Sequence, residues 1–366
     1  MILCEEVFHS PSGVAFADVI TDGHRESWPI RSKRFRNWVR RCYYQATGTA
    51  PGNAVIGSAL DLLEARAQFD APERVVSMRV AEHAGKIYLD LADEHWRAVV
   101  IDAEGWRVLG CPPVRFRRFP GMMPLPMPER GGSVEILKPF LNASNENDFV
   151  LIVAWLLAAL RPSGSYPLLA ISGEQGSAKT VLSKVLRALF DPNVAPIRAL
   201  PRDERELMIA ANNSHLLAFD NLSGLPPWLS DALCRIASGG SFAVRRLYTD
   251  EEEVLFQAAR PTLLNGIEDV IARADLADRA IFLSLGRFER KSGVLKLSFG
   301  GNSSVSAPSF WAPYLMRQSM AYGPSVPFPP ITCRVWLILR SGPGRAKSAS
   351  GLPALSIAPI QTTGRL

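Results

Sequence analysis

The sequence lacks the features that mark secreted, zinc-ribbon and membrane-spanning proteins. Its five cysteines are scattered and odd in number, and no CxxC pair occurs, so we expect neither a zinc ribbon nor a disulfide framework. The N-terminus shows no basic stretch followed by an apolar one, the pattern of a signal peptide. The longest apolar run, at 149–160, is too short for a bilayer and predicts a buried helix. We therefore expect a cytoplasmic protein without a membrane segment.

Carboxylates are absent from the last part of the chain. Residues 290–366 contain no Asp or Glu but nine Lys or Arg, and they are rich in Ser and Pro. The other 32 basic and all 35 acidic residues lie in 1–289, which carries a net charge of −3, so the overall +6 belongs to the tail. That charge is therefore weak evidence for nucleic-acid binding. We expect 290–366 to be an atypical, poorly ordered tail. One hypothesis is a shifted reading frame, which translating the other frames of the gene would test.

The rest of the chain divides at a Pro- and Gly-rich stretch. Residues 1–130 predict a smaller α/β module, with helices near 31–44 and 53–69, strands within 74–91 and 96–109, and a linker at 111–132. Residues 131–289 alternate between strand-like and helix-like segments. Strands and helices taking turns predict a mostly parallel sheet covered by helices.

The stretch YPLLAIS-GEQGSAKT-VLSKVLRALF, residues 166–190, has the pattern of a phosphate-binding loop. An apolar strand delivers the chain, small residues let backbone N–H groups surround phosphates, and a helix points its N-terminus at them. Lys179 would reach the β and γ phosphates, and the Thr180 hydroxyl would ligate Mg²⁺. Ala178 stands where such loops usually carry glycine, which is tolerated if its φ is negative. The alternative is a plain glycine turn before a helix. The predicted nucleotide-binding residues are Gly173, Glu174, Gln175, Gly176, Ser177, Ala178, Lys179 and Thr180.

A carboxylate that could share the metal with Thr180 follows the apolar run HLLAFDN. Asp220 lies about 40 residues past the lysine and would hold Mg²⁺, although it could instead cap the next turn. Many ATPases carry an acidic residue next, but here Asn221 follows. An amide can orient water but cannot accept its proton, so hydrolysis would be slow or use another base. Glu174 is a possible substitute, or a solvated loop residue.

Two further polar residues fit a nucleotide hydrolase. Asn265 ends RPTLLNG and could sense the γ-phosphate, or it could form an Asn-Gly turn. Downstream lie Arg273 and Arg279, and an arginine such as Arg279 could be supplied across a subunit interface to stabilise charge on the transferring phosphoryl group. Arg279 could equally end a helix in an ion pair with Asp275 or Asp278.

Two basic segments are open to two interpretations each. Arg245 and Arg246, in a predicted hairpin over 242–259, could contact nucleic-acid phosphates or pair with the acidic residues 250–253. The arginine-rich helix near 31–41 could dock on a phosphate backbone or form a solvated basic face.

Five segments together resemble the ATPase core of phage- and plasmid-associated primase-helicase proteins, which are AAA+ ATPases akin to superfamily 3 helicases. In chain order these are GEQGSAKT, LLAFDNLSGLPPWLSDALCRIASGG, RRLYTDEEEV, RPTLLNGIEDV and DLADRAIFLSL. The stretches 24–32 and 88–108 look like the region preceding that core, so the resemblance covers roughly 5–289. It implies a P-loop NTPase core of AAA+ type with ATP and Mg²⁺ bound, assembly of identical subunits into a ring, and movement along DNA.

Carried over by position, the resemblance gives each candidate a role. Lys179 and Thr180 would bind phosphate and metal, Asp220 would hold Mg²⁺, Asn265 would be the polar sensor, and Arg279 would be the arginine donated by a neighbour. The sequence departs from the pattern of this family in two respects, and we expect both to affect its activity. No primase domain precedes the core, so primer synthesis is not expected, and the usual helical lid would fall in the atypical tail.

The favoured hypothesis is an ATP-hydrolysing, helicase-like motor that acts on single-stranded DNA in the replication of a phage- or plasmid-type element. The alternative is a nucleotide-binding module with weak or no hydrolysis, either a switch or a truncated or frameshifted remnant. A third interpretation, a small-molecule kinase, predicts an acceptor pocket and lid for which the sequence offers no pattern.

Overall fold

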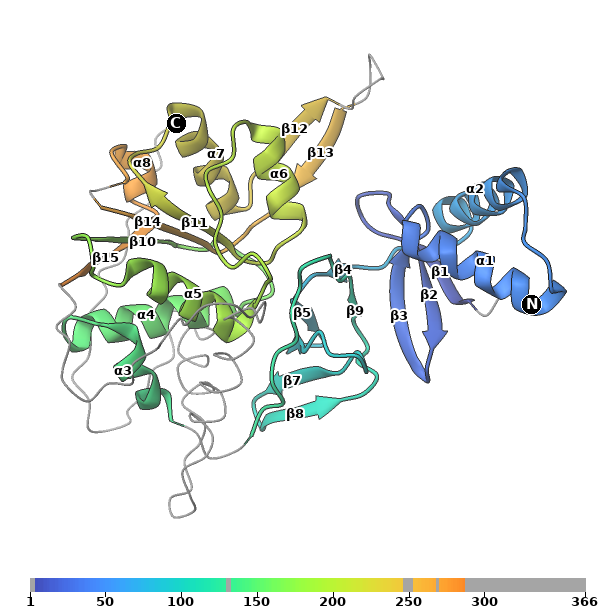
Figure 1. Cartoon of the computed structure of the whole chain (residues 1–366), viewed down its shortest axis with the longest axis horizontal. Helices are drawn as coiled ribbons and strands as arrows, with labels where there is room; N and C mark the ends of the chain where they lie inside the picture. Colours follow the sequence, from blue (N-terminus) through green and yellow to red (C-terminus); the bar gives the residue numbers. More distant parts are fainter. Residues whose placement is uncertain (1–3, 130–132, 246–252, 268–269, 287–366) are drawn as a thin grey trace, which may run out of the picture. The chain divides into compact units, whose positions relative to one another are not determined.

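The computed structural model of the protein describes residues 4–129, 133–245, 253–267 and 270–286 (Figure 1). The tail predicted over 290–366 lies outside these residues, as do Arg246 and the acidic residues 250–252 of the predicted hairpin. Among the described residues, no helix combines the length and the apolarity needed to cross a bilayer.

The first part of the chain is a three-stranded antiparallel sheet with two helices packed on it (Figure 1). The strands run in the order β1-β2-β3, and both predicted helices form. Ser32 begins α1 by accepting a hydrogen bond from the backbone of Phe35, and Gly48 ends it in the left-handed conformation. The elements are β1 (Cys4–His9), β2 (Ala15–Thr21), β3 (His24–Pro29), α1 (Lys33–Thr47) and α2 (Asn53–Phe69).

A four-stranded antiparallel meander follows, in the order β5-β6-β7-β8. Its last hairpin turns between Asp102 and Gly105, as the sequence predicts. The expectation of a linker over 111–132 is only partly right. Residues 115–116 pair with residues 76–77 as parallel strands, and the Leu125 N–H donates to the Leu91 carbonyl. The elements are β4 (Val76–Ser77), β5 (Val80–His83), β6 (Lys86–Asp90), β7 (Ala98–Asp102), β8 (Gly105–Leu109) and β9 (Arg115–Phe116).

The alternating pattern after 133 gives the parallel sheet that the sequence predicts. Its order is β11-β14-β10-β15, and all three neighbouring pairs are parallel. The predicted hairpin forms as the antiparallel pair β12-β13. The strands are β10 (Leu168–Gly173), β11 (Leu217–Leu222), β12 (Ser241–Arg245), β13 (Glu253–Gln257), β14 (Thr262–Gly266) and β15 (Ala280–Leu285). The helices are η1 (Val134–Leu137), α3 (Lys138–Leu141), α4 (Glu146–Ala159), α5 (Lys179–Phe190), α6 (Glu204–Asn212), α7 (Pro227–Ser238) and α8 (Ala274–Ala277).

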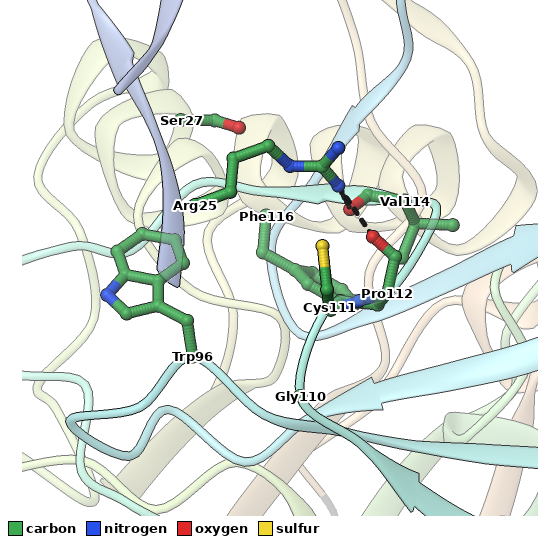
Figure 2. A pocket seen from close by; sticks show the side chains of 8 residues that line it. All are labelled: Arg25, Ser27, Trp96, Gly110, Cys111, Pro112, Val114 and Phe116. Carbon is green, nitrogen blue, oxygen red and sulfur yellow. Dashed lines mark hydrogen bonds between the residues drawn. The ribbon is translucent and has the colours of Figure 1, made fainter. Parts of the chain in front are cut away.

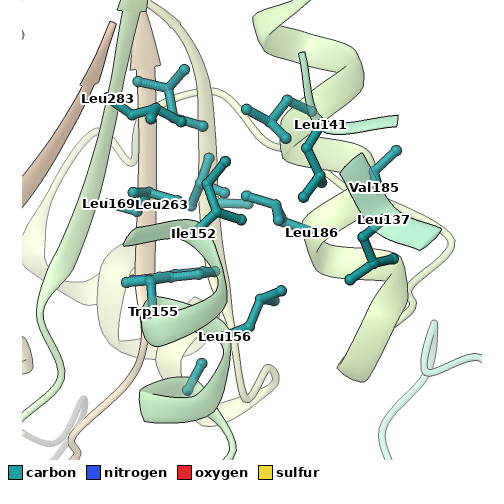
Figure 3. Close-up of a cluster of buried hydrophobic side chains, with 14 of the residues drawn as sticks. Leu137, Leu141, Ile152, Trp155, Leu156, Leu169, Val185, Leu186, Leu263 and Leu283 are labelled. Carbon is teal, nitrogen blue, oxygen red and sulfur yellow. The ribbon is translucent and has the colours of Figure 1, made fainter. Parts of the chain in front are cut away.

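Helices cover both faces of this sheet (Figure 1). Alternate residues of β10 point to opposite sides: Leu169 and Ile171 join the cluster under α3, α4 and α5, whereas Leu168 and Ala170 join the one under α6, α7 and α8. Figure 3 shows the first cluster, to which α4 contributes Ile152, Trp155 and Leu156 and the sheet contributes Leu169, Leu263 and Leu283. A sheet buried on both faces explains why its strands read as continuous apolar runs.

A buried polar network lies at the end of α5. The Asp191 carboxylate accepts from Arg79 Nε at 3.2 Å and from the Leu216 N–H at 3.0 Å, and its Oδ2 lies 3.6 Å from Arg187 Nη2. Arg79, Arg187 and Asp191 are all buried. Arg79 also donates to the backbone carbonyls of Asp90 and Met123, so this network ties β6 and the segment after β9 to the end of α5.

The buried side chain of His215 lies next to this network, and we expect it to make the protein less stable in acid. Burial lowers its pKa to about 4, although nearby Asp191 acts in the opposite direction. Because the unfolded chain takes up this proton near pH 6.5, stability is fully present above that pH and falls towards pH 4, by about 3 kcal/mol. Urea unfolding at pH 7.5 and 4 measures the loss. His215→Gln should flatten the slope, whereas the same change at exposed His95 should leave it; equal slopes in both variants would contradict the prediction.

Candidate nucleotide-binding site

The loop between β10 and α5 is held tightly at its base. Gly173 has φ +150°, and a Cβ there would lie 2.6 Å from the Leu285 carbonyl oxygen and 2.9 Å from the Ser177 hydroxyl. The Asn142 side chain donates to the Ser177 carbonyl at 3.0 Å. Position 173 therefore requires glycine. Asn142, in the turn after α3, supports the loop, and no sequence pattern marked it as a site residue.

The loop presents backbone N–H groups at the start of α5. The N–H groups of Gly176, Ala178, Lys179 and Thr180 make no hydrogen bond to any other residue in the described part of the chain. Gly176 has φ +87°, and a Cβ there would meet nothing within 4 Å, so that side of the loop is open. Unpaired N–H groups at a helix N-terminus attract anions because the helix dipole adds to their partial charge.

Lys179 crosses the loop that precedes it. Its Nζ donates to the carbonyl oxygens of Gly173 at 2.6 Å and Glu174 at 2.8 Å, and lies 3.3 Å from the Ser177 hydroxyl. The ammonium group thus lies beside the unpaired loop amides, where it adds a full positive charge. Glu174 and Gln175 are exposed, so the chemistry of this site rests on backbone amides and Lys179.

Ala178 does not meet the condition that the sequence argument set for it. Tolerating its methyl group was expected to need a negative φ, but the residue has φ +64° and ψ +22°. This left-handed conformation brings Cβ close to the carbonyl oxygen and costs about 1–2 kcal/mol for an alanine. The loop keeps the geometry that glycine would allow and stores strain at this position.

This strain predicts that Ala178→Gly stabilises the protein. Removing the methyl group relieves the left-handed strain, and the greater flexibility of glycine in the unfolded chain offsets part of the gain, leaving about 0.5–1 kcal/mol. Ala65→Gly is the matched control because that exposed alanine lies in the interior of α2, where glycine should destabilise by a similar amount. Urea unfolding compares the two, and destabilisation by both would contradict the strain.

The predicted metal ligands lie together. Thr180 Oγ1 is 3.1 Å from Asp220 Oδ1 and 3.3 Å from Oδ2, although the two residues are 40 apart in sequence. Asp220 also accepts from the Asn221 N–H at 3.0 Å. A bulge between Phe219 and Leu222 shifts the register of β11 here, and Asn221 takes φ +58°. A hydroxyl and a carboxylate are oxygen ligands of the kind Mg²⁺ prefers, so the residues present fit this ion.

Asn265 is a buried brace between three elements. Its Oδ1 accepts from the Asn221 N–H at 3.0 Å, and its Nδ2 donates to the Ser183 hydroxyl of α5 at 2.8 Å. Both Asn265 and Gly266 lie in β14, so the Asn-Gly turn that the sequence allowed does not form. Ser183 is a further residue that the sequence argument missed. Its neighbours one turn away on α5 are Lys179 and Arg187, so no apolar pattern set this hydroxyl apart in the sequence.

Arg279 is not brought to the loop within one chain. It immediately precedes β15, whose first residue pairs with Leu168, whereas the loop begins at Gly173, at the other end of β10. Along β10, the five-residue step from Leu168 to Gly173 corresponds to about 17 Å, so Arg279 is about that far from the start of the loop. Arg279 is exposed, and its Nη1 donates to the backbone carbonyl of Asp275 at 2.5 Å. Arg273, which immediately precedes α8, forms the ion pairs in this region instead, with Asp231 and Asp275.

Two of the hollows in the described part of the chain lie outside the loop itself. An open groove of about 570 Å³ borders Asp220 and Asn221, with walls from residues 197–200 and 220–223. The second is a space of about 10 Å³ in the N-terminal part (Figure 2). Arg25 closes it by donating to the carbonyls of Pro112 and Val114, and it has room for about one water.

One family model matches part of the chain. Residues 134–297 match the family model of the actinomycete integrative conjugative element replication protein. The match begins at η1 and includes β10, the loop, α5 and Asp220, and it spans under half of the chain. A search of curated proteins found no match.

Several solved structures resemble the chain at low identity. The A-form apo structure of the NrS-1 C-terminal region has TM-score 0.46 and 11% identity, covering 86% of this chain and 64% of that one. JCV helicase, solved with a bound acetamide compound, has TM-score 0.31 and 12% identity, covering 42% and 45%. A full-length MCM homolog from Methanopyrus kandleri has TM-score 0.28 and 12% identity, covering 78% and 71%. The chain thus spans less than two thirds of the length of the first of these structures.

Proposed function

We propose that this protein binds ATP and Mg²⁺ through the loop after β10 and uses ATP hydrolysis to act on DNA as a helicase-like motor. One observation carries the proposal: the Thr180 hydroxyl lies 3.1 Å from the Asp220 carboxylate, at the end of a loop in which four N–H groups have no hydrogen-bond partner among the described residues. A hydroxyl that opens a helix and a carboxylate at the end of a nearby strand form the Mg²⁺ site of P-loop nucleotide hydrolases. The match of residues 134–297 to a conjugative-element replication protein supports DNA of a mobile element as the partner.

In this proposal, the role of each residue follows from its chemistry. The N–H groups of Gly176, Ala178, Lys179 and Thr180 would surround the phosphates, and the Lys179 ammonium would compensate negative charge on them. Thr180 and Asp220 would hold the magnesium ion, which supplies Lewis-acid stabilisation of phosphate charge when bound. The Asn265 brace would keep the β11 bulge, and with it Asp220, in place beside α5.

Hydrolysis in this proposal needs more than one subunit. Because Arg279 lies at the other end of β10 from the loop, it could reach a bound nucleotide only on a neighbouring subunit. Turnover per subunit should therefore rise with protein concentration. A ring of identical subunits would supply this arginine at every site.

A second candidate function is nucleotide binding with little turnover. It rests on Asn221, whose amide replaces the acidic residue that would accept a proton from water and whose N–H is tied to Asp220 and Asn265. Such a protein would act as a switch. The same loop geometry serves both functions, so only a rate separates them.

The deciding experiment measures ATP binding and ATP turnover on the full chain, with and without single-stranded DNA. Turnover that needs Mg²⁺ and rises several-fold with single-stranded DNA supports the motor. Tight binding without turnover, at every protein concentration and with DNA present, supports the switch. Absence of nucleotide binding overturns both. Asp220→Asn should lower turnover at least tenfold, whereas the exposed control Asp231→Asn should not.

A further inference from the structure

Helix α1 of the N-terminal part is basic and carries no acidic residue. Its fifteen residues, KRFRNWVRRCYYQAT, contain one lysine and four arginines. Its apolar side is packed against the rest of the N-terminal part. Phe35 is fully buried, and Trp38 and Val39 pack against the cluster formed with β2, β3 and α2. Within the described part of the chain, the opposite side therefore faces solvent.

Side chains on that outward side form one continuous stripe. Lys33, Arg36, Arg40 and Tyr44 follow one another at spacings of three or four residues, which places them above one another on a helix. Arg41 and Tyr43 flank the stripe. From Lys33 to Tyr44 it is about 17 Å long. Tyr44 is 60% exposed and Tyr43 38%, unusually open positions for two neighbouring aromatic rings.

The charges of this stripe are not neutralised within the described part of the chain. Lys33, Arg36 and Arg41 have no carboxylate partner there, and Arg40 donates to the neutral side chain of Asn53 at 2.6 Å. The other cations nearby differ. Arg34 pairs with Glu26 and lies over the Trp28 ring, and Arg31 pairs with Asp61 and Glu64 on α2.

We propose that the basic-aromatic stripe of α1, formed by Lys33, Arg36, Arg40, Arg41, Tyr43 and Tyr44, binds single-stranded nucleic acid. The cations would contact consecutive phosphates, and the tyrosine rings would stack on bases. Stacking selects single strands because the bases of a duplex are stacked on each other and unavailable. A membrane surface fits less well: an amphipathic helix enters a bilayer with its apolar side, which α1 has already buried.

This proposal deepens the proposed function by naming a DNA-contacting surface, and it rests on that function only for DNA as the partner. Binding through α1 needs no nucleotide. Lys179→Ala should therefore leave it unchanged, and α1 variants should keep ATP turnover measured without DNA. The failure of one proposal is thus visible independently of the other.

Fluorescence anisotropy of a labelled single-stranded oligothymidylate, without nucleotide and over a range of salt concentrations, tests the stripe. The double variant Arg36→Ala, Arg41→Ala should weaken binding at least fivefold and reduce the slope of log K against log salt by about 1.4, or about 0.7 per lost phosphate contact. Arg66→Ala, at an exposed arginine on α2, is the matched single-charge control and should leave affinity and slope nearly unchanged.

Replacing Tyr44 separates stacking from charge. Tyr44→Ala should weaken binding about fivefold to a hundredfold, whereas Tyr44→Phe should bind like the wild type. Thermal unfolding checks that each exposed substitution leaves the fold intact. Wild-type affinity in the double arginine variant and in Tyr44→Ala would overturn the proposal. So would equal binding of duplex and single strand, or α1-dependent binding of phosphatidylserine vesicles but not of DNA.

Discussion

Lys179→Ala is expected to lower ATP turnover at least a hundredfold. The structure places the Lys179 ammonium within 2.8 Å of two carbonyls of the loop, beside N–H groups that have no hydrogen-bond acceptor among the described residues. A positioned cation that stabilises charge on a transferring phosphoryl group contributes roughly 10²–10³ in rate, as single electrostatic donors in other enzymes do. Nucleotide binding should weaken as well, because the charge also stabilises the bound ground state.

Lys184→Ala is the matched control for this variant. Lys184 lies on the same helix α5, five residues further on, and it is exposed. Both variants remove one positive charge from one helix, so a general electrostatic effect would reduce turnover in both. Steady-state turnover and binding of a fluorescent ATP analogue should change in Lys179→Ala alone. Equal rates in wild type and Lys179→Ala would contradict the role of the loop.

Local patterns predicted the central part of the site because it is built from contiguous segments. An apolar strand, a glycine-bearing loop and an amphipathic helix are visible in 166–190, and the structure has β10, the loop and α5 in that order. The contact between Thr180 and Asp220 could also be anticipated, since residues that follow parallel strands gather at one edge of the sheet. The roles given to these residues stay predictions until turnover is measured.

The details that the sequence missed depend on register and tertiary contacts. The positive φ of Ala178 runs against the backbone preference of alanine, so no propensity indicated it. The bond between Asn265 and Ser183 joins residues 82 apart, and the distance of Arg279 from the loop depends on the pairing of β15 with β10. The Pro- and Gly-rich stretch read as a linker because its partners, such as Leu91, lie far away in sequence.

Asp191→Ala is expected to destabilise the protein by about 3–5 kcal/mol, the largest change in stability that the structure predicts. Burial alone would raise the pKa of Asp191, but Arg79 and Arg187 outweigh it and hold the pKa below its usual value, so the group is a carboxylate between two buried arginines. Removing it leaves both guanidinium groups without a counter-charge and removes the acceptor of the Leu216 N–H. Breaking a buried pair from one side is far more costly than replacing both partners.

A double-mutant cycle distinguishes this effect from a simple loss of contacts. Arg79→Met on its own should also destabilise, but Arg79→Met combined with Asp191→Ala should cost clearly less than the sum of the two single changes, because fewer buried charges remain unpaired. The exposed pair Asp231 and Arg273 provides the control, since Asp231→Ala should cost no more than about 1 kcal/mol. Urea unfolding of the wild type, the two single variants and the double variant gives the coupling free energy between Arg79 and Asp191. Strict additivity, or a cost at Asp191 as small as that at Asp231, would show that the network around the end of α5 does not hold these charges as the structure describes.

The coupling also bears on function. Arg79 donates hydrogen bonds to the backbone carbonyls of Asp90 and Met123. An intact network therefore means that the end of α5, the helix that begins at Lys179, is fixed to the preceding β-meander.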